Sequence, residues 1–241
     1  MTSPELTVVA PCYNEELNVD ALCARTLAVF DAMPIPVELV LVDDGSRDDT
    51  WGRISAAMAA DPRVRGVRHP KNRGIVGGWL SGLEHARAPL VCLIDSDLQN
   101  RPEDIPRLHA TYVAEQPDMV QAVRHSQGSL NRLAFSKGLN LLLNVTFGMH
   151  LRDNKSGFIL CRREVLADIL ADAPGYRYFQ SFIGVAAGAR NLRVAEIDTV
   201  FEARTAGESF LSGFPALVSL RIVKELMRYR LATLRRRRSK P

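Results

Sequence analysis

The sequence lacks the segments that mark an exported or membrane-spanning protein. Residues 1–5 hold no basic segment followed by an apolar one, so we expect no secretory leader. The longest mostly apolar stretch, Leu139–Leu151, is interrupted by polar residues and is shorter than the ~20 apolar residues that a spanning helix needs. The 4 cysteines lie far apart and form no Cys-x-x-Cys pair, so we expect buried free thiols in a reducing cytoplasm.

Several motifs of other protein classes are also missing. The glycines of residues 74–82 do not follow the Gly-x-Gly-x-x-Gly fingerprint, so a dinucleotide site is unsupported. The chain has no internal repeat. Its 5 histidines show no metal-binding spacing with cysteine or glutamate; they are His69, His85, His109, His125 and His150.

The composition is that of a globular protein, with 46% hydrophobic and 24% charged residues. The formal charge of +4 is unevenly distributed. From Arg221 onward, nine basic residues and one acid give a net charge of +8, so the preceding 220 residues carry −4. An acidic body does not suit nucleic acid, and we expect no nucleic-acid partner.

Strand and helix signals alternate in the first half of the chain. The expected strands are residues 6–10, 37–42, 64–67 and 90–94, and the expected helices are residues 17–32, 48–60, 74–86 and 102–115. Continuous apolar strands that alternate with helices predict an α/β fold with a mostly parallel central sheet flanked by helices. Ligands of such sheets bind at the carboxyl ends of the strands.

The second half of the chain is less regular. Strands are expected at residues 119–123 and 158–161, and at 194–203 as a strand pair or one bent strand. Helices are expected at residues 130–147, 164–170, 178–189 and 214–238. We predict one domain over residues 1–212 and a basic amphipathic helix or tail over residues 213–241.

The strongest candidate for chemistry is the segment that follows the expected strand at residues 90–94. Asp95, Asp97 and Gln99 supply two carboxylates and an amide oxygen at alternate positions. Oxygen ligands of this kind suit Mg²⁺ or Mn²⁺, which share their coordination shell with substrate phosphates. The alternative is a polar turn that caps the next helix.

Two further polar segments follow expected strands. After residues 37–42, the carboxylates of Asp43 and Asp44 could accept hydrogen bonds from a base or a ribose, or they could cap the following helix. After residues 6–10, Tyr13 could stack on a base and Glu15 could accept a hydrogen bond from it.

Together, the three segments resemble glycosyltransferase family 2, whose members have the GT-A nucleotide-sugar fold. The segments are Pro-Cys-Tyr-Asn-Glu at residues 11–15, Val-Asp-Asp-Gly-Ser at 42–46 and Asp-Ser-Asp-Leu-Gln-Asn at 95–100. The resemblance covers residues 5 to 212 and is strongest to the branch of polyprenyl-phosphate sugar transferases, which includes the dolichol-phosphate mannose synthases. It implies that Asp95, Asp97 and Gln99 hold a metal on a nucleoside diphosphate. It also implies a nucleotide pocket lined by Pro11, Tyr13, Glu15, Val42, Asp43, Asp44, Arg73, Asp95 and Ser96.

The second half of the chain is similar to the same branch. Residues 153–158 resemble its Asp-x-x-Ser-Gly-Phe element, and residues 204–209 resemble its Arg-x-x-Gly-Glu-Ser element. The resemblance implies that an acceptor phosphate is held by Arg124, Arg152, Ser156 and Arg204. Phe210 stands where the branch usually has a lysine, which removes one expected cation.

The resemblance implies an inverting, metal-dependent glycosyl transfer from a nucleoside-diphosphate sugar to a polyprenyl phosphate. The metal and Arg73 would neutralise charge on the departing nucleotide, with Asp97 and Arg204 among the catalytic residues. A phosphate nucleophile needs no strong base. A hydroxyl acceptor would need one, for which Asp153 is the candidate; the alternative for Asp153 is a turn residue.

The sequence leaves the identity of the acceptor open. A soluble enzyme of the same family could glycosylate a hydroxyl of a metabolite or a glycan, and an inactive nucleotide-binding scaffold is a third possibility. The basic amphipathic tail and the apolar segment at residues 130–151 favour peripheral contact with the inner face of the membrane. The alternative for the tail is a helix that packs on the body.

Overall fold

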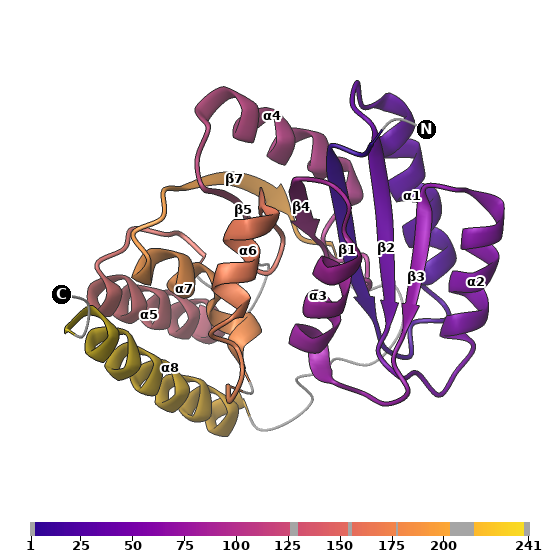
Figure 1. The fold of residues 1–241 in the computed structure, drawn as a ribbon. Helices are drawn as coiled ribbons and strands as arrows, with labels where there is room; N and C mark the ends of the chain where they lie inside the picture. Colours follow the sequence, from indigo (N-terminus) through magenta and orange to yellow (C-terminus); the bar gives the residue numbers. More distant parts are fainter. Residues whose placement is uncertain (1–2, 126–129, 154–155, 177, 203–214, 239–241) are drawn as a thin grey trace.

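The structure, a computed structural model, describes residues 3–125, 130–153, 156–176, 178–202 and 215–238. Within these ranges one sheet has the strand order β3-β2-β1-β4-β6-β5-β7 (Figure 1). The strands are β1 (Leu6–Cys12), β2 (Val37–Asp43), β3 (Val64–Arg68), β4 (Leu90–Leu93), β5 (Met119–His125), β6 (Ile159–Arg162) and β7 (Val194–Val200). Only β6 runs antiparallel to its neighbours within this sheet. The predicted mostly parallel sheet is confirmed.

Helices cover both faces of the sheet. They are α1 (Val19–Ala32), α2 (Thr50–Ala60), α3 (Gly74–His85), α4 (Ile105–Glu115), α5 (Leu130–Phe147), α6 (Arg163–Leu170), α7 (Ile183–Ala189) and α8 (Pro215–Arg238), with 3₁₀ turns η1 (Pro102–Asp104) and η2 (Phe179–Phe182). Side chains of α1, α2 and α4 build the hydrophobic core on one face, and those of α3, α5, α6, α7 and α8 build it on the other.

The alternation of side chains along β1 explains these two cores. Val8 and Ala10 point into the core beneath α1 and α2, whereas Val9 points into the core beneath α3. All three are fully buried, as expected for a strand covered on both faces. The continuous apolar run in the sequence therefore reflects burial on two sides.

Helix α3 lies unusually close to β1 because it presents glycines to the strand. A Cβ atom at Gly82 would lie 2.2 Å from Cγ1 of Val9, and one at Gly78 would lie 2.7 Å from Cβ of Pro11. The glycine cluster that did not fit a dinucleotide fingerprint thus serves helix–strand packing. The contact with Pro11 also brings the first half of α3 close to the end of β1.

Helix α8 packs on the body of the protein. Leu226 and Tyr229 are 2% and 1% exposed and belong to the core that α5 and α7 also build. The Tyr229 hydroxyl donates to Asp172 (2.8 Å) and accepts from Arg190 (2.8 Å). The predicted boundary at residue 213 falls outside the described residues and stays a prediction. Among the helices that the structure describes, none combines the length and apolar character that crossing a membrane requires.

Two sequence expectations differ in detail from the structure. The segment at residues 102–115 begins as the 3₁₀ turn η1 before α4 starts, which follows from Pro102 and Pro106 in its first turns. Val194–Val200 form a single strand, β7, and Phe201 then makes an isolated antiparallel bridge to Asn100; residue 203, the end of the expected segment, lies outside the described residues. This bridge connects the end of β7 to the loop that follows β4.

Candidate active site

The polar segments singled out in the sequence meet at one edge of the sheet. Strands β1, β2 and β4 are parallel, so their carboxyl ends share this edge. Strands β5 and β7 end there as well, and the antiparallel β6 begins there. The edge therefore gathers the segments that the sequence assigned to the nucleotide, the metal and the acceptor.

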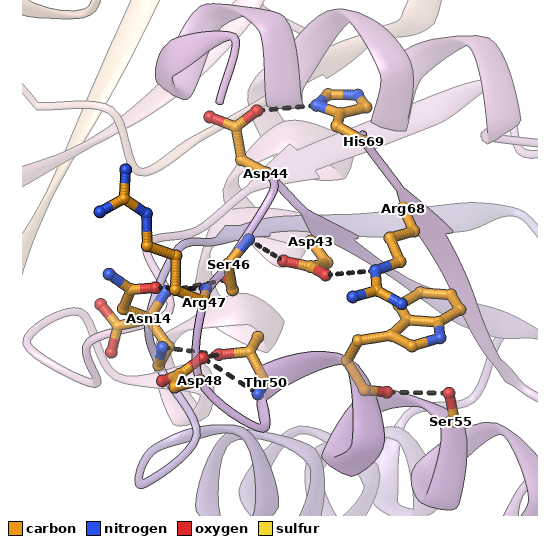
Figure 2. A network of polar contacts seen from close by, with 12 residues as sticks. Asn14, Asp43, Asp44, Ser46, Arg47, Asp48, Thr50, Ser55, Arg68 and His69 are labelled. Carbon is orange, nitrogen blue, oxygen red and sulfur yellow. Dashed lines mark hydrogen bonds and ion pairs between the residues drawn. The ribbon is translucent and has the colours of Figure 1, made fainter. Parts of the chain in front are cut away.

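The loops after β1 and β2 are held together by hydrogen bonds between backbone and side chains (Figure 2). The Asn14 N–H donates to Oγ of Ser46 (3.0 Å), and the Arg47 N–H donates to Oδ1 of Asn14 (2.9 Å). Asn14 has a φ of 54°, a left-handed conformation that asparagine tolerates better than most residues. The reciprocal bonds fix the loop that carries Tyr13 and Glu15 against the start of α2.

Asp48 strengthens this connection. Its carboxylate accepts from the Glu16 N–H (3.2 Å) and from both the N–H (3.1 Å) and the hydroxyl (2.6 Å) of Thr50. Burial raises the pKa of Asp48, but these hydrogen bonds outweigh burial and hold the pKa below its usual value. Asp48 thus remains charged and caps the first turn of α2.

Asp43 and Asp44 face different partners although they are adjacent in sequence. Asp43 is fully buried, accepts from the Ser46 N–H (2.9 Å) and forms an ion pair with Arg68 (3.2 Å), whose guanidinium lies over the Trp51 ring (Figure 2). These contacts give Asp43 a structural part in the turn after β2.

Asp44 points toward the loop between β3 and α3. Its Oδ1 contacts Nδ1 of His69 (2.7 Å) and accepts from the backbone N–H of Arg73 (2.8 Å). The guanidinium of Arg73 in turn donates to Oγ of Ser81 (3.2 Å). The structure thus brings Asp44 and Arg73, both assigned to the nucleotide pocket, into direct contact.

A hollow of about 420 Å³ opens beside these loops and is lined by Gly45, Ser46, Arg68, His69 and Pro70. Gly45 has a φ of +74°, and a Cβ atom there would lie 2.6 Å from the carbonyl carbon of Lys71. Only glycine permits this close approach of the loop after β2 to the loop after β3.

The remaining residues assigned to the nucleotide pocket lie around the same loops. Tyr13 and Glu15 are half-buried, as is Pro11, which packs against Gly78. Oε2 of Glu15 accepts from the amide of Asn18 (2.5 Å). The Val42 side chain is fully buried in the core, so any contact of Val42 with a ligand would come from its backbone.

The loop after β4 carries the proposed metal ligands. Asp95 is half-buried, and Ser96 and Asp97 are buried. The Asn100 amide donates to Oδ2 of Asp95 (3.0 Å), and the Gln99 N–H donates to Oδ1 of Asp97 (3.1 Å). Hydrogen bonds therefore orient both carboxylates.

Gln99 is connected to the segment that follows β7. Its amide nitrogen donates to the carbonyl oxygen of Glu202 (3.3 Å), and the Glu202 N–H donates to the carbonyl oxygen of Gln99 (2.9 Å). Since the amide nitrogen faces Glu202, the amide oxygen is the atom that could ligate a cation.

The donor set fits a hard divalent cation. Asp95, Asp97 and Gln99 offer only oxygen atoms, which Mg²⁺ and Mn²⁺ prefer. The residues that the structure describes contain no cluster of three or more His, Cys, Asp or Glu side chains able to enclose a metal ion. Two carboxylates and one amide form a partial shell, which suits a cation that also binds substrate phosphates.

Arg124, at the end of β5, connects the metal loop to the proposed acceptor residues. Its guanidinium binds Asp153 with two hydrogen bonds, from Nε (2.8 Å) and from a terminal nitrogen (3.2 Å). Burial lowers the pKa of Arg124, but the charges of Asp153, Asp95 and Asp97 raise it by more. The guanidinium therefore lies within electrostatic reach of both metal-loop carboxylates, and it also lies over the Phe201 ring.

The other proposed acceptor residues are placed less uniformly. Arg152 is half exposed, with its guanidinium paired to Glu196 (3.3 Å) and Asp198 (2.7 Å). Ser156 is fully buried, and its carbonyl oxygen accepts from the Gln121 amide (2.9 Å). Arg204 and Phe210 lie outside the described residues.

The fold is that of GT-A glycosyltransferases. The chain aligns with the crystal structure of glucosyl-3-phosphoglycerate synthase from Mycobacterium tuberculosis in complex with phosphoglyceric acid, with a TM-score of 0.65 and 23% identity over 85% of this chain and 73% of that one. It also aligns with the complex of that synthase with Mg²⁺ and uridine diphosphate, with a TM-score of 0.65 and 21% identity over the same shares of the two chains.

Residues 7–170 match the model of glycosyl transferase family 2, and the chain belongs to this family. It is 38% identical over 217 residues to undecaprenyl-phosphate 4-deoxy-4-formamido-L-arabinose transferase of Shewanella sediminis, covering 89% of this chain and 64% of that protein. A protein of the same name from Pectobacterium carotovorum is 34% identical over 218 residues, with the same two shares. The chain thus spans about two thirds of the length of these relatives.

Sequence reasoning missed two parts of the site. His69 was set aside because no metal-type spacing surrounds it, yet it contacts Asp44 and Ser81. Glu202 was not singled out, although its backbone binds Gln99 in both directions. The position of His69 two residues after the predicted strand at residues 64–67 was the one available signal.

Proposed function

We propose that this protein transfers a sugar from a nucleoside diphosphate to a polyprenyl phosphate, with inversion at the anomeric carbon. Family membership and the names of the curated relatives, which act on undecaprenyl phosphate, support this acceptor class. The UDP in the solved neighbour and the sugar in the names of the relatives make a UDP-linked 4-deoxy-4-formamido-L-arabinose the first donor to test.

The donor would bind along the edge where β1, β2 and β4 end. Asp44 and Arg73 would contact the nucleoside, and Asp95, Asp97 and Gln99 would hold Mg²⁺ or Mn²⁺ on the diphosphate. Once bound, the cation would neutralise the charge that develops on the leaving nucleotide. The hydrogen bonds from Asn100 and from the Gln99 N–H hold the two carboxylates in place, which lowers the cost of organising the site when the donor arrives.

The observation that carries the proposal is the position of Arg124 beside Asp153, Asp95 and Asp97. An anionic acceptor that approaches a cluster of carboxylates needs a cation to oppose their repulsion, and a guanidinium can bind phosphate oxygens in pairs. The phosphate is already an anion at neutral pH, so its oxygen can attack the anomeric carbon without a general base.

The same pair argues against the hydroxyl acceptor. A general base needs a free oxygen to accept a proton, and both carboxylate oxygens of Asp153 already accept hydrogen bonds from the Arg124 guanidinium. Transfer to a metabolite or glycan hydroxyl is therefore the second candidate.

Peripheral membrane contact would bring the enzyme to a lipid-linked acceptor. Exposed apolar side chains lie on α5 (Leu141, Leu142 and Val145) and on α8 (Met227 and Leu231). The two helices lie side by side, and the Phe147 and Tyr229 rings are 6.4 Å apart (Figure 1). Exposed Arg221, Lys224 and Arg228 on α8 add positive charge that suits an anionic leaflet, and we place the protein at the inner face of the membrane on this basis.

The test compares two acceptors that differ in one group. The protein is incubated with the nucleotide sugar and Mn²⁺, together with either undecaprenyl phosphate or undecaprenol. We expect product on the phosphate alone, with the inverted anomer in the NMR spectrum. Product on undecaprenol or on a soluble hydroxyl would favour the second candidate, and failure to bind or transfer any nucleotide sugar would favour an inactive scaffold.

A further inference from the structure

A hydrogen-bonded series of four side chains, three of them buried, lies behind the proposed nucleotide pocket. Asp44 follows β2, His69 follows β3, Arg73 precedes α3, and Ser81 lies within α3. Asp44, His69 and Ser81 are 3%, 5% and 4% exposed. The hydrogen bonds thus join two loops and a helix, with Arg73 exposed at one end of the series, and Figure 2 shows the contact between Asp44 and His69 at the other end.

The donors and acceptors in this series favour one tautomer of the imidazole. The Asp44 carboxylate can only accept, so Nδ1 of His69, 2.7 Å from it, carries a proton. Arg73 can only donate, and its terminal nitrogen lies 3.2 Å from Oγ of Ser81 and 3.5 Å from Nε2 of His69. The tautomer with its proton on Nδ1 keeps an N–H away from this cation and lets Nε2 accept from the Ser81 hydroxyl (2.8 Å).

All the hydrogen bonds then run in one direction, from Arg73 through Ser81 and His69 to Asp44. Oδ1 of Asp44 accepts a second bond from the backbone N–H of Arg73 (2.8 Å), which closes the series into a ring. A buried polar network in which each member is satisfied is rigid, because any rotation leaves a group unpaired in a medium of low polarity.

The order Asp–His–Ser is also that of a hydrolase triad, but the geometry does not support a nucleophile. Ser81 lies on a helix at 4% exposure, and its hydroxyl is covered by the Arg73 guanidinium. The hydrogen bonds therefore orient the charged side chains at the two ends of the series, Asp44 and Arg73, which are assigned to the proposed nucleotide pocket.

We infer that His69 is a positioning residue that orients Asp44 and Arg73 toward the base of the donor nucleotide. The inference rests on the proposed function, since it assumes that these two residues contact the nucleoside. The close approach of Gly45 to Lys71 means that the loops carrying Asp44 and Arg73 touch, so loss of the imidazole shifts both.

Three substitutions separate the two ends of the imidazole. His69→Asn keeps an N–H near the position of Nδ1 and preserves the bond to Asp44. His69→Gln places its amide near the position of Nε2 and preserves only the contact with Ser81, and His69→Ala removes both. His85→Asn is the matched control, because His85 lies on the same helix as Ser81 and its Nδ1 contacts the Ser81 carbonyl oxygen (2.8 Å), away from Asp44.

The measurement is the Kd of two probes in the presence of Mn²⁺. UDP is titrated alongside CDP, GDP and ADP, and the tightest of these is compared with pyrophosphate, which lacks base and ribose. We expect His69→Gln and His69→Ala to weaken nucleotide binding about tenfold or more, with His69→Asn and His85→Asn near wild type. Pyrophosphate binding should fall by much less than nucleotide binding in His69→Gln and His69→Ala, because the cation would still hold the diphosphate, whereas a general loss of structure would weaken both probes equally.

A long-range ¹H–¹⁵N spectrum of the histidine rings gives a readout independent of ligand. We expect the Nδ1–H tautomer for His69, and an Nε2–H tautomer or an imidazolium would overturn the inference. Equal nucleotide Kd values for wild type, His69→Gln and His69→Ala would overturn it as well. If the wild type binds no nucleoside diphosphate, the proposed function fails and this role fails with it, whereas equal Kd values contradict the role of His69 alone.

Discussion

The guanidinium of Arg124 and the carboxylate of Asp153 face each other in a two-point contact, with N···O distances of 2.8 and 3.2 Å. The two residues come from the end of β5 and from the segment that precedes β6. Their side chains are 25% and 10% exposed, so the pair is partly shielded from water. Both residues have proposed roles at the acceptor, and their contact makes those roles separable by experiment.

Removal of either partner should affect transfer to undecaprenyl phosphate differently. Arg124→Ala should lower kcat/KM by about 100-fold, because the cation that would face the acceptor phosphate is lost. Asp153→Asn should lower it by less than about tenfold, since the amide still accepts a hydrogen bond from Arg124 and no general base is needed. Steady-state kinetics with both variants check this. If Asp153→Asn were as inactive as Asp97→Asn, a general base would be indicated instead.

Metal dependence should be confined to the loop after β4. Asp97→Asn should abolish the increase in melting temperature that Mn²⁺ and UDP produce together. A ligand stabilises the folded protein only when it binds, and by an amount that grows with its affinity. Asp20→Asn, an exposed acid on α1, is the control and should leave the increase intact. Thermal shift with UDP alone, with Mn²⁺ alone and with both checks the prediction, and an undiminished joint shift in Asp97→Asn would place the cation elsewhere.

Two glycines should respond in opposite directions to the same substitution. Gly82→Ala should lower the free energy of unfolding by about 1–3 kcal/mol, since its Cβ would lie 2.2 Å from Cγ1 of the buried Val9. Gly138→Ala, on α5 with no atom within 4 Å of the new Cβ, should raise it by about 0.5–1 kcal/mol. Urea unfolding measures both, and a neutral Gly82→Ala would mean that α3 does not sit this close to β1.

The parallel sheet could be predicted because strands that are buried on both faces have continuous apolar sequences, such as residues 6–10. The antiparallel direction of β6 could not, since a four-residue apolar run looks the same in either direction. Asp95 and Asp97 could be proposed as metal ligands because they follow a predicted strand at alternate positions, and their role stays a prediction.

The contacts that complete the site join residues that are far apart in the sequence. No local sequence pattern predicts such contacts. Arg124 and Asp153 are 29 residues apart and meet only because β6 reverses beside β5. His69 acquires a role from Ser81, which lies about two turns into the next helix. A lone histidine after a strand carries no periodic signal that would distinguish this role from simple packing.

The buried thiols should make the protein less stable in alkali. Burial raises the pKa of Cys23 to about 11 and that of Cys161 to about 12, above the ordinary value of 9.0. Between the unfolded and folded pKa values, the folded state binds more protons, so the free energy of unfolding should fall as the pH rises above about 9. Urea unfolding at pH 7 to 10.5 checks this. Cys161→Ala should flatten the decline, and a decline that is unchanged in this variant would assign it to other groups.

The exposed apolar surface of α5 should bind anionic vesicles in a way that the exposed surface of α4 does not. Val145 on α5 is 75% exposed and Val113 on α4 is 59% exposed, and α4 covers the opposite face of the sheet. Val145→Glu should lower the bound fraction about fivefold or more, because it removes an apolar contact and adds a charge that anionic lipid repels. Val113→Glu adds the same charge to the protein as a whole, so equal losses for both variants in a co-sedimentation assay would mean that net charge, not the α5 surface, governs binding. Salt at 0.5 M should weaken wild-type binding if Arg221, Lys224 and Arg228 contribute, since screening acts within a few ångströms at high ionic strength.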